Sequence, residues 1–360
     1  MFTLSTLLRR PWFAAAVPHR PLVGIDIGAS AVKVAEMERL GKGWRLRYAD
    51  CHPLPPEAVN DGQIKQPDTV LQALQTLLDR HAQHSKNAAF SLSGSAVITK
   101  KIHMAPLSEL ELEEQIALEA EEYIPFEIQD VNLDFHIISR QDDNMEVLLV
   151  ACKKELIESH AALIRQAGLQ PLVCDLDLLA LINAWQTFVP GNPATMLVNM
   201  GASMLNVAIV SADGQPGYIR DHALGSRQMI QELQSRCECP FPAAEQLLIM
   251  TENPTQNQVV NTQRQEIIAT FLEQLLQQLR QALQFYKAAS PEQPVSRILL
   301  AGGAALLPAA ATTLQERLQL PVTVWDPLAG LSPLAAASAT PCAAPRYAIA
   351  LGLALRGERQ

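Results

Sequence analysis

Two stretches of this 360-residue chain repeat each other, and the repeat limits what the chain can fold into. Residues 24–37 read GIDIGASAVKVAEM, residues 197–210 read LVNMGASMLNVAIV, and the two align without gaps. Each copy predicts a strand, a tight turn and a second strand, because apolar residues flank a small-residue turn in which glycine adopts backbone conformations closed to other residues. Two unrelated hairpins with common turn residues are the alternative, and the second copy in register disfavours it.

The two turns have the chemistry of a phosphate-binding site. Successive backbone N–H groups of such a turn can point at one phosphate. An acid just before the turn can hold the water shell of Mg²⁺, which prefers one or two carboxylates and keeps most of its waters. Asp26 is that acid in the first copy, and the isosteric Asn199 replaces it in the second. The candidate phosphate- and magnesium-binding residues are Asp26, Gly28, Ala29, Ser30, Asn199, Gly201, Ala202 and Ser203, with Mg²⁺ bound by Asp26 through water.

Paired hairpins of this kind, about half a chain apart, resemble the two phosphate loops of the actin, Hsp70 and sugar-kinase superfamily. Within it, the first hairpin together with residues 119–138, EAEEYIPFEIQDVNLDFHII, resembles the PilM family of FtsA-like proteins of type IV pilus assembly. The resemblance covers about residues 21–356, and Tyr123–Glu127 is its most family-specific part. It implies a two-domain, actin-like α/β fold (the ribonuclease H-like, ASKHA fold) with an FtsA-type 1C subdomain, SHS2-like, inserted in the first domain.

This resemblance divides the chain into four parts. They are a flexible leader of residues 1–20, actin-like domain I of residues 21–93, 153–192 and 343–357, the inserted 1C subdomain of residues 94–152, and actin-like domain II of residues 193–342.

Local patterns give the expected elements. Strands are expected at about 22–27, 31–38 and 44–51. In the inserted subdomain, Ser108 and Glu111 can form a capping box at the start of an acidic helix. A long glutamine-rich helix at about 257–289 carries an apolar stripe at roughly 3.5-residue spacing, which predicts a core-facing side and leaves the glutamines in solvent. The stripe is Ile267, Ile268, Phe271, Leu275, Leu279 and Leu283, and the Ala- and Pro-rich residues 329–345 are expected to form a loop.

The resemblance also implies ATP with Mg²⁺ as the ligand and adds further site residues. Lys33 stands where a lysine of related proteins reaches the β- and γ-phosphates, although simple alternation along the strand would leave it facing solvent. Asp177 matches a catalytic Glu or Gln of hydrolysing relatives, but we favour a plain helix N-terminal acid that interacts with the helix dipole. The candidate adenosine-binding residues are Gly225, Glu245, Gly302, Gly303 and Ala304, and Leu248 stands where the family's adenosine helix carries a lysine.

Composition limits the partners. Hydrophobic residues make up 48% and charged residues 18% of the chain, as in globular proteins. The net charge is −9 with no basic block, which argues against nucleic acid. No apolar run approaches the eighteen or so residues of a membrane helix.

The family resemblance implies a specific partner, the N-terminal cytoplasmic tail of PilN, an inner-membrane protein. The tail would bind in an extended conformation in a groove between the inserted subdomain and domain I, where an exposed edge strand is a reasonable receptor. The chain would then be cytoplasmic and peripheral on the inner membrane through that partner. Binding of other inner-membrane pilus components or of pilus motor ATPases, and self-association, stay open.

Two functions from different classes follow. In one, the chain is a nucleotide-binding scaffold whose nucleotide state favours one state of the partner groove, which requires different affinities for the two states. In the other, it is an active ATPase or phosphotransferase. Asn199 removes one of two charges near the metal, typically worth roughly 1.5–3 kcal/mol, and Leu248 removes a ribose contact. We therefore expect weak to moderate ATP binding with slow or absent hydrolysis.

Overall fold

The computed structural model describes residues 21–41, 43–81, 85–189, 191, 193–250, 257–329, 331–333 and 342–358. The chain forms two compact units, which we call unit 1 (Met1–Ala184, Gly330–Pro341 and Ile349–Gln360) and unit 2 (Trp185–Ala329 and Cys342–Ala348). The predicted leader of residues 1–20 lies outside the described residues. The predicted domain boundaries stay predictions.

Unit 1 is built on a six-stranded sheet of order β10-β6-β1-β2-β3-β16. Strands β1, β2 and β3 form an antiparallel meander. Strand β6 pairs parallel to β1, and β10 pairs parallel to β6. The three predicted strands are confirmed, whereas part of the expected loop 329–345 is a strand that pairs with β3. The strands are β1 Val23–Ile27, β2 Ala31–Leu40, β3 Gly43–Pro53, β6 Asn87–Leu92, β10 Gln170–Leu176 and β16 Ser332–Pro333, and β4 Val59–Asn60 pairs with β5 Gln63–Ile64 in a separate ribbon.

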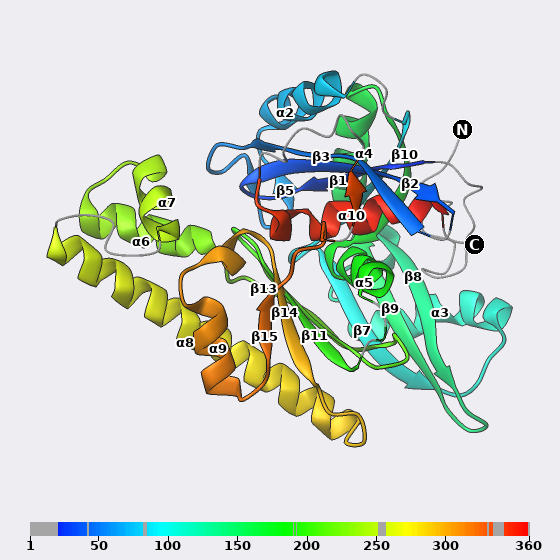
Figure 1. Ribbon diagram of the computed structural model, residues 1–360. Helices are drawn as coiled ribbons and strands as arrows, with labels where there is room; N and C mark the ends of the chain where they lie inside the picture. The colour runs from blue at the N-terminus through cyan, green and yellow to red at the C-terminus, as the bar shows by residue number, and fades with distance from the viewer. Residues whose placement is uncertain are drawn as a thin grey trace. The chain divides into compact units, whose positions relative to one another are not determined.

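Helices cover both faces of this sheet (Figure 1). Alternation along β1 and β6 explains why, since Ile25 and Phe90 point to one apolar cluster and Ala89 points to another. The first cluster is completed by α2 Pro67–Arg80 and α4 Lys154–Gln166, and the second by α5 Asp177–Phe188 and α10 Ala348–Ala354. A Cβ at Gly352 would lie 1.8 Å from the Ala180 carbonyl oxygen, so α10 and α5 pack backbone to backbone.

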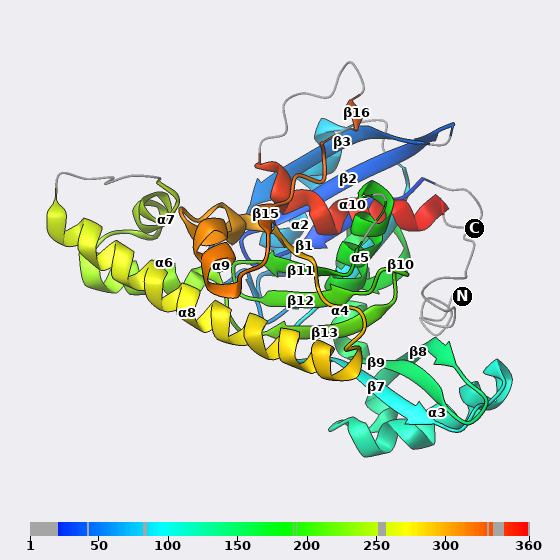
Figure 2. The ribbon, with the colours of Figure 1, turned by 60° about the horizontal axis from the view of Figure 1, so that its bottom comes forward.

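The inserted region forms a small subdomain of its own within unit 1 (Figure 2). Its three-stranded antiparallel sheet has the order β7-β9-β8. Leu112, Ile116 and Ala120 of α3 pack on one face of that sheet. Both hydrogen bonds of the predicted capping box between Ser108 and Glu111 are present, which confirms it. The elements are β7 Val97–Met104, α3 Glu109–Tyr123, η1 Ile128–Asp130, β8 Val131–Arg140 and β9 Met145–Lys153.

Unit 2 is built on a five-stranded sheet of order β13-β12-β11-β14-β15. The predicted long helix is confirmed as α8, and its apolar stripe lies in the core of the unit, with Leu283 partly buried at the edge. The strands are β11 Thr195–Met200, β12 Leu205–Val210, β13 Pro216–His222, β14 Arg297–Ala301 and β15 Val322–Val324. The helices are α6 Ser226–Cys237, α7 Phe241–Ile249, α8 Gln258–Ala289, η2 Gly303–Leu306 and α9 Ala310–Leu318, and η3 Ala344–Tyr347 and η4 Leu355–Glu358 flank α10.

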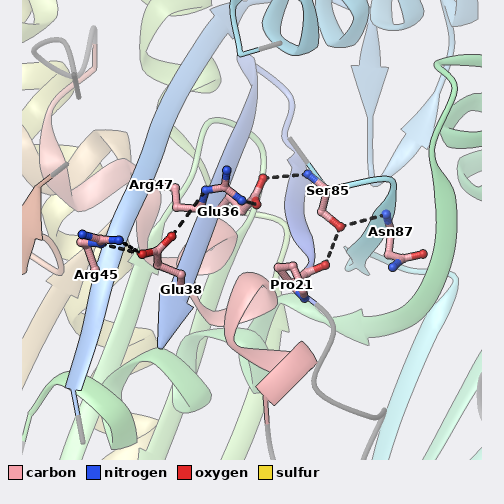
Figure 3. Close-up of polar contacts among 7 residues, drawn as sticks. All are labelled: Pro21, Glu36, Glu38, Arg45, Arg47, Ser85 and Asn87. Carbon is pink, nitrogen blue, oxygen red and sulfur yellow. Dashed lines mark hydrogen bonds and ion pairs between the residues drawn. The ribbon is translucent and has the colours of Figure 1, made fainter. Parts of the chain in front are cut away.

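A buried acid ties together the start of the described chain and the meander of unit 1 (Figure 3). Glu36 on β2 is fully buried and accepts hydrogen bonds from Arg47 Nη1 at 2.6 Å and from the backbone N–H of Ser85 at 3.0 Å. Ser85 Oγ in turn donates to the Pro21 carbonyl. Because a buried carboxylate must be paired to be stable, this network fixes how β1 enters the sheet.

Candidate functional site

In the first hairpin, the structure joins the acid before the turn to a lysine beyond it. The β1–β2 register places Asp26 opposite Lys33, and Lys33 Nζ donates to Asp26 Oδ2 at 2.7 Å. The two side chains are only 7% and 12% exposed, so Lys33 does not face solvent as simple alternation would have it. A Cβ at Gly28 would lie 3.0 Å from Lys33 Nζ and 3.5 Å from Asp26 Oδ1. Both charged groups therefore lie beside the bare backbone of the turn.

The turn itself is held by the sheet. The Gly28 N–H donates to the Ala31 carbonyl at 3.1 Å, and the Ser30 carbonyl accepts from the Leu54 N–H at 2.9 Å. Ala29 is buried and Ser30 is exposed. The end of β3 thus fixes the shape of the turn and leaves the Ser30 side chain at the surface.

The residues present suit a hydrated magnesium ion at this turn. Asp26 Oδ2 binds Lys33, whereas Oδ1 lies on the side of Gly28. One carboxylate oxygen that holds a metal-bound water is the kind of contact that Mg²⁺ makes in phosphate sites. Among the described residues, no group of three His, Cys, Asp or Glu side chains could bind a metal ion directly. The fit is therefore to a water-mediated ion only.

Asp177 begins α5 and is bonded to the neighbouring strand. Ser91 Oγ on β6 donates to Asp177 Oδ1 at 2.6 Å. An acid in the first turn of a helix interacts favourably with the helix dipole. This geometry supports the interpretation of Asp177 as a structural helix N-terminal acid, because its carboxylate already has a protein partner.

The second hairpin repeats the first with neutral groups. The β11–β12 register places Asn199 opposite Asn206, which is the repeat position of Lys33. Asn199 Nδ2 donates to Asn206 Oδ1 at 2.7 Å, and Asn206 Nδ2 donates to Asp221 Oδ1 at 2.7 Å. The Gly201 N–H donates to the Met204 carbonyl at 2.9 Å. An amide chain that ends at a carboxylate on β13 thus replaces the ion pair of the first hairpin.

Two glycines from distant parts of unit 2 meet the second turn. A Cβ at Gly225 would lie 2.3 Å from the Ala202 carbonyl oxygen and 2.7 Å from the Ser203 nitrogen, so only glycine fits where α6 begins. Gly302 has φ +85°, and a Cβ there would lie 2.7 Å from Asn199 Oδ1. The structure therefore brings together candidates that the sequence placed in three separate segments.

The remaining adenosine candidates differ in how they relate to this cluster. Gly303 and the buried Ala304 follow Gly302 directly in η2. Glu245 is half-buried on α7, and the described part of the chain contains no hydrogen bond from it to the second turn. Leu248 is 2% exposed and belongs to the core of unit 2, so its apolar side chain stabilises the packing of α7.

Sequence reasoning missed Asn206 and Asp221. The repeat itself contains the signal for Asn206, because it aligns with Lys33. Asp221 gives no such signal, since only the pairing of β12 with β13 brings it opposite Asn206.

A third polar group lies in unit 1 where the inserted subdomain meets the main sheet. Asp134 on β8 lines a cavity of about 10 Å³, the space of a single water, together with Asn132, Cys152 and Asp175. Burial, and to a smaller extent the nearby Asp175 carboxylate, raise the pKa of Asp134 to about 8, against the opposing effects of the Phe135 N–H and Arg356. Below about pH 8, the protonated form of the Asp134 carboxyl group is therefore favoured.

Comparison with known proteins decides the family. Residues 24–358 match the family model of the type IV pilus assembly protein PilM. The chain belongs to the PilM family. None of the described helices is long and apolar enough to cross a membrane.

Solved structures agree with this family in fold. A PilM–PilN type IV pilus biogenesis complex contains a chain that is 24% identical, with a TM-score of 0.81 over 94% of this chain and 99% of that one. The MamK double helical filament is 10% identical (TM-score 0.52; 95% and 99% coverage). MreB5 of Spiroplasma citri bound to ADP is 13% identical (TM-score 0.50; 93% and 95% coverage). This PilM-family chain therefore has the predicted two-domain, actin-like α/β fold.

Proposed function

We propose that this PilM-family protein is a nucleotide-binding scaffold of type IV pilus assembly, which binds Mg-ATP and hydrolyses it slowly or not at all. The observation that carries the proposal is the repeated hairpin with its cross-strand pair, Asp26 with Lys33 in unit 1 and Asn199 with Asn206 in unit 2. Lys33 supplies a cation beside one glycine turn, and Asp26 offers a carboxylate to a metal-bound water. The solved relative MreB5 binds ADP, which supports an adenine nucleotide as the ligand.

Slow hydrolysis follows from the site's charges. The second hairpin has no carboxylate at its head, and Asp221 on β13 accepts a hydrogen bond from Asn206. Asp177 is engaged by Ser91, so it is not free to orient an attacking water. We expect a steady-state ATPase rate far below the ordinary enzymatic range of about 1–10³ s⁻¹, unchanged in Asp177→Asn. An ordinary rate that disappears in Asp177→Asn would establish the alternative, an active ATPase.

The proposed partner is the N-terminal cytoplasmic tail of PilN. Support comes from the similar solved structure, which is a PilM–PilN complex. The inserted subdomain also has a suitable receptor, because β7 and β8 are both edges of its sheet and an extended peptide can add to an exposed edge. The protein would then be held at the cytoplasmic side of the inner membrane through PilN. Further pilus components, motor ATPases and self-association stay open.

Coupling between nucleotide and partner has a direct test. A fluorescently labelled PilN tail peptide is titrated with the full chain, with and without saturating Mg-ATP, and a scrambled peptide of the same composition is the control. We expect the native peptide alone to bind, with an affinity that changes on addition of Mg-ATP. Equal binding of both peptides by folded protein would refute the partner assignment. Native-peptide binding that is indifferent to Mg-ATP would refute the coupling alone.

A further inference from the structure

Arg346 is held against the glycine turn of unit 2 by the backbone. It lies in η3, and the Gly302 N–H donates to the carbonyl of the preceding residue, Pro345, at 2.9 Å. The Arg346 N–H donates to the Ala343 carbonyl at 3.1 Å. These bonds place the arginine beside Gly302 and Gly303, although it lies more than forty positions further along the chain.

The guanidinium of Arg346 lies against Gly303. A Cβ built at Gly303 would be 3.2 Å from Arg346 Nε and 3.5 Å from both Cζ and Nη2. A point at nearly equal distances from these three atoms lies to one side of the guanidinium plane. Gly303 therefore lies on one side of the guanidinium, and its lack of a side chain lets the arginine approach the backbone closely.

Among the residues that the structure describes, the Arg346 side chain has no protein partner. Its Nε is buried without a hydrogen bond, and within the described ranges the side chain has no ion pair. Arg317 of the same unit, by contrast, binds Glu273 with both terminal nitrogens, at 2.6 and 3.1 Å. A buried donor without a partner typically costs roughly 1–3 kcal/mol. An arginine kept in this state beside a glycine turn is typical of a position that awaits a ligand.

We propose that Arg346 binds the purine base of the nucleotide, with the base stacked on the guanidinium face opposite Gly303. The inference rests on the proposed nucleotide-binding function and adds a base-recognition residue to it. A planar, delocalised guanidinium stacks on π systems, whereas a lysine ammonium has no such face. Arg346, Gly303 and the base would form three layers, and the Nε–H would be available to a polar atom at the edge of the ligand.

The test compares a nucleotide with its phosphate part alone. The full chain is titrated with Mg-ATP by calorimetry, and Mg-tripolyphosphate is titrated separately and as a competitor. Arg346→Ala should weaken Mg-ATP binding roughly 2- to 30-fold, the range of one cation–π contact, and leave tripolyphosphate affinity unchanged. Arg346→Lys, which keeps the charge, should lose nearly as much Mg-ATP affinity. Arg317→Ala is the matched control and should bind like the wild type.

The outcomes separate the two claims. If wild-type protein binds no Mg-ATP, the proposed function fails, and this inference fails with it. If the wild type binds Mg-ATP and Arg346→Ala binds it equally well, only the base-recognition role is overturned. An equal loss of ATP and tripolyphosphate affinity would assign Arg346 to the phosphates and overturn base stacking. Unchanged thermal unfolding of Arg346→Lys keeps the result independent of folding defects.

Discussion

At the scale of single residues, the two hairpins differ in the cross-strand pair that each carries. Asp26 and Lys33 form a nearly buried ion pair, and Asn199 and Asn206 form a neutral amide pair. The repeat in the sequence predicts that these positions correspond, but it does not predict which atoms pair. The contact of Asp221 with the second pair cannot be predicted from the repeat, because Asp221 lies on β13, a third strand that the two-strand repeat does not include.

The charge of Asp26 should contribute to stability. Asp26→Asn leaves the Lys33 ammonium without a counter-ion in a site where it is only 12% exposed. We expect the free energy of unfolding in urea to fall by roughly 1.5–3 kcal/mol. Glu158→Gln is a matched control, since Glu158 and Arg165 form an exposed pair that should be worth no more than about 1 kcal/mol. Equal losses of unfolding free energy in both variants would mean that the nearly buried Asp26–Lys33 pair contributes no more to stability than an exposed pair.

Asp134 should make stability fall as pH rises from 4 to 8. Its pKa is raised from an ordinary aspartate value to about 8 by burial. The folded state therefore holds a proton that the unfolded state has lost, so stability is fully present below about pH 4 and is lost as pH rises through about 8. Asp134→Asn, which cannot ionise, should be more stable than the wild type at pH 8 and should show a flatter profile in urea denaturation across this range. Parallel profiles for the two proteins would contradict this assignment.

At the scale of elements, hydrophobic periodicity and helix-capping residues predict helices well, because both depend on residues close together in the sequence. The apolar stripe of α8 and the Ser108 cap of α3 are both found as expected. The pairing of β16 with β3 was not predictable, since Ser332–Pro333 lies in an Ala- and Pro-rich segment without a strand pattern and joins the sheet through tertiary contact. The sequence likewise gives no sign that η3 brings Arg346 to Gly303.

The capping box of α3 should stabilise the inserted subdomain. Ser108 Oγ accepts the Glu111 N–H, and the Glu111 carboxylate accepts the Ser108 N–H. Ser108→Ala should cost about 1 kcal/mol, the usual value of a lost N-cap, and should increase amide exchange in the first turn of α3. Glu113→Ala, an exposed change on the same helix, should have almost no effect. Faster exchange in Glu113→Ala than in Ser108→Ala would show that the cap is unimportant.

At the scale of the whole molecule, the same type of β-hairpin occurs in both units of this actin-like chain. The family match over residues 24–358 accounts for the fold, and each unit carries one hairpin with its own cross-strand pair. The neutral pair of the second hairpin distinguishes this chain's candidate site from one with two acids. We propose that this chain retains nucleotide binding and has reduced turnover.

The most direct test of this account is a calorimetric titration of the full chain with Mg-ATP, run beside Asn199→Asp and Asp26→Ala. The wild type should bind weakly to moderately. Asn199→Asp should bind more tightly, by up to roughly 1.5–3 kcal/mol, because it restores a charged partner near the metal. Asp26→Ala should lose binding. If folded protein binds no Mg-ATP in the wild type or in Asn199→Asp, the hairpins are not a nucleotide site and the central claim is wrong.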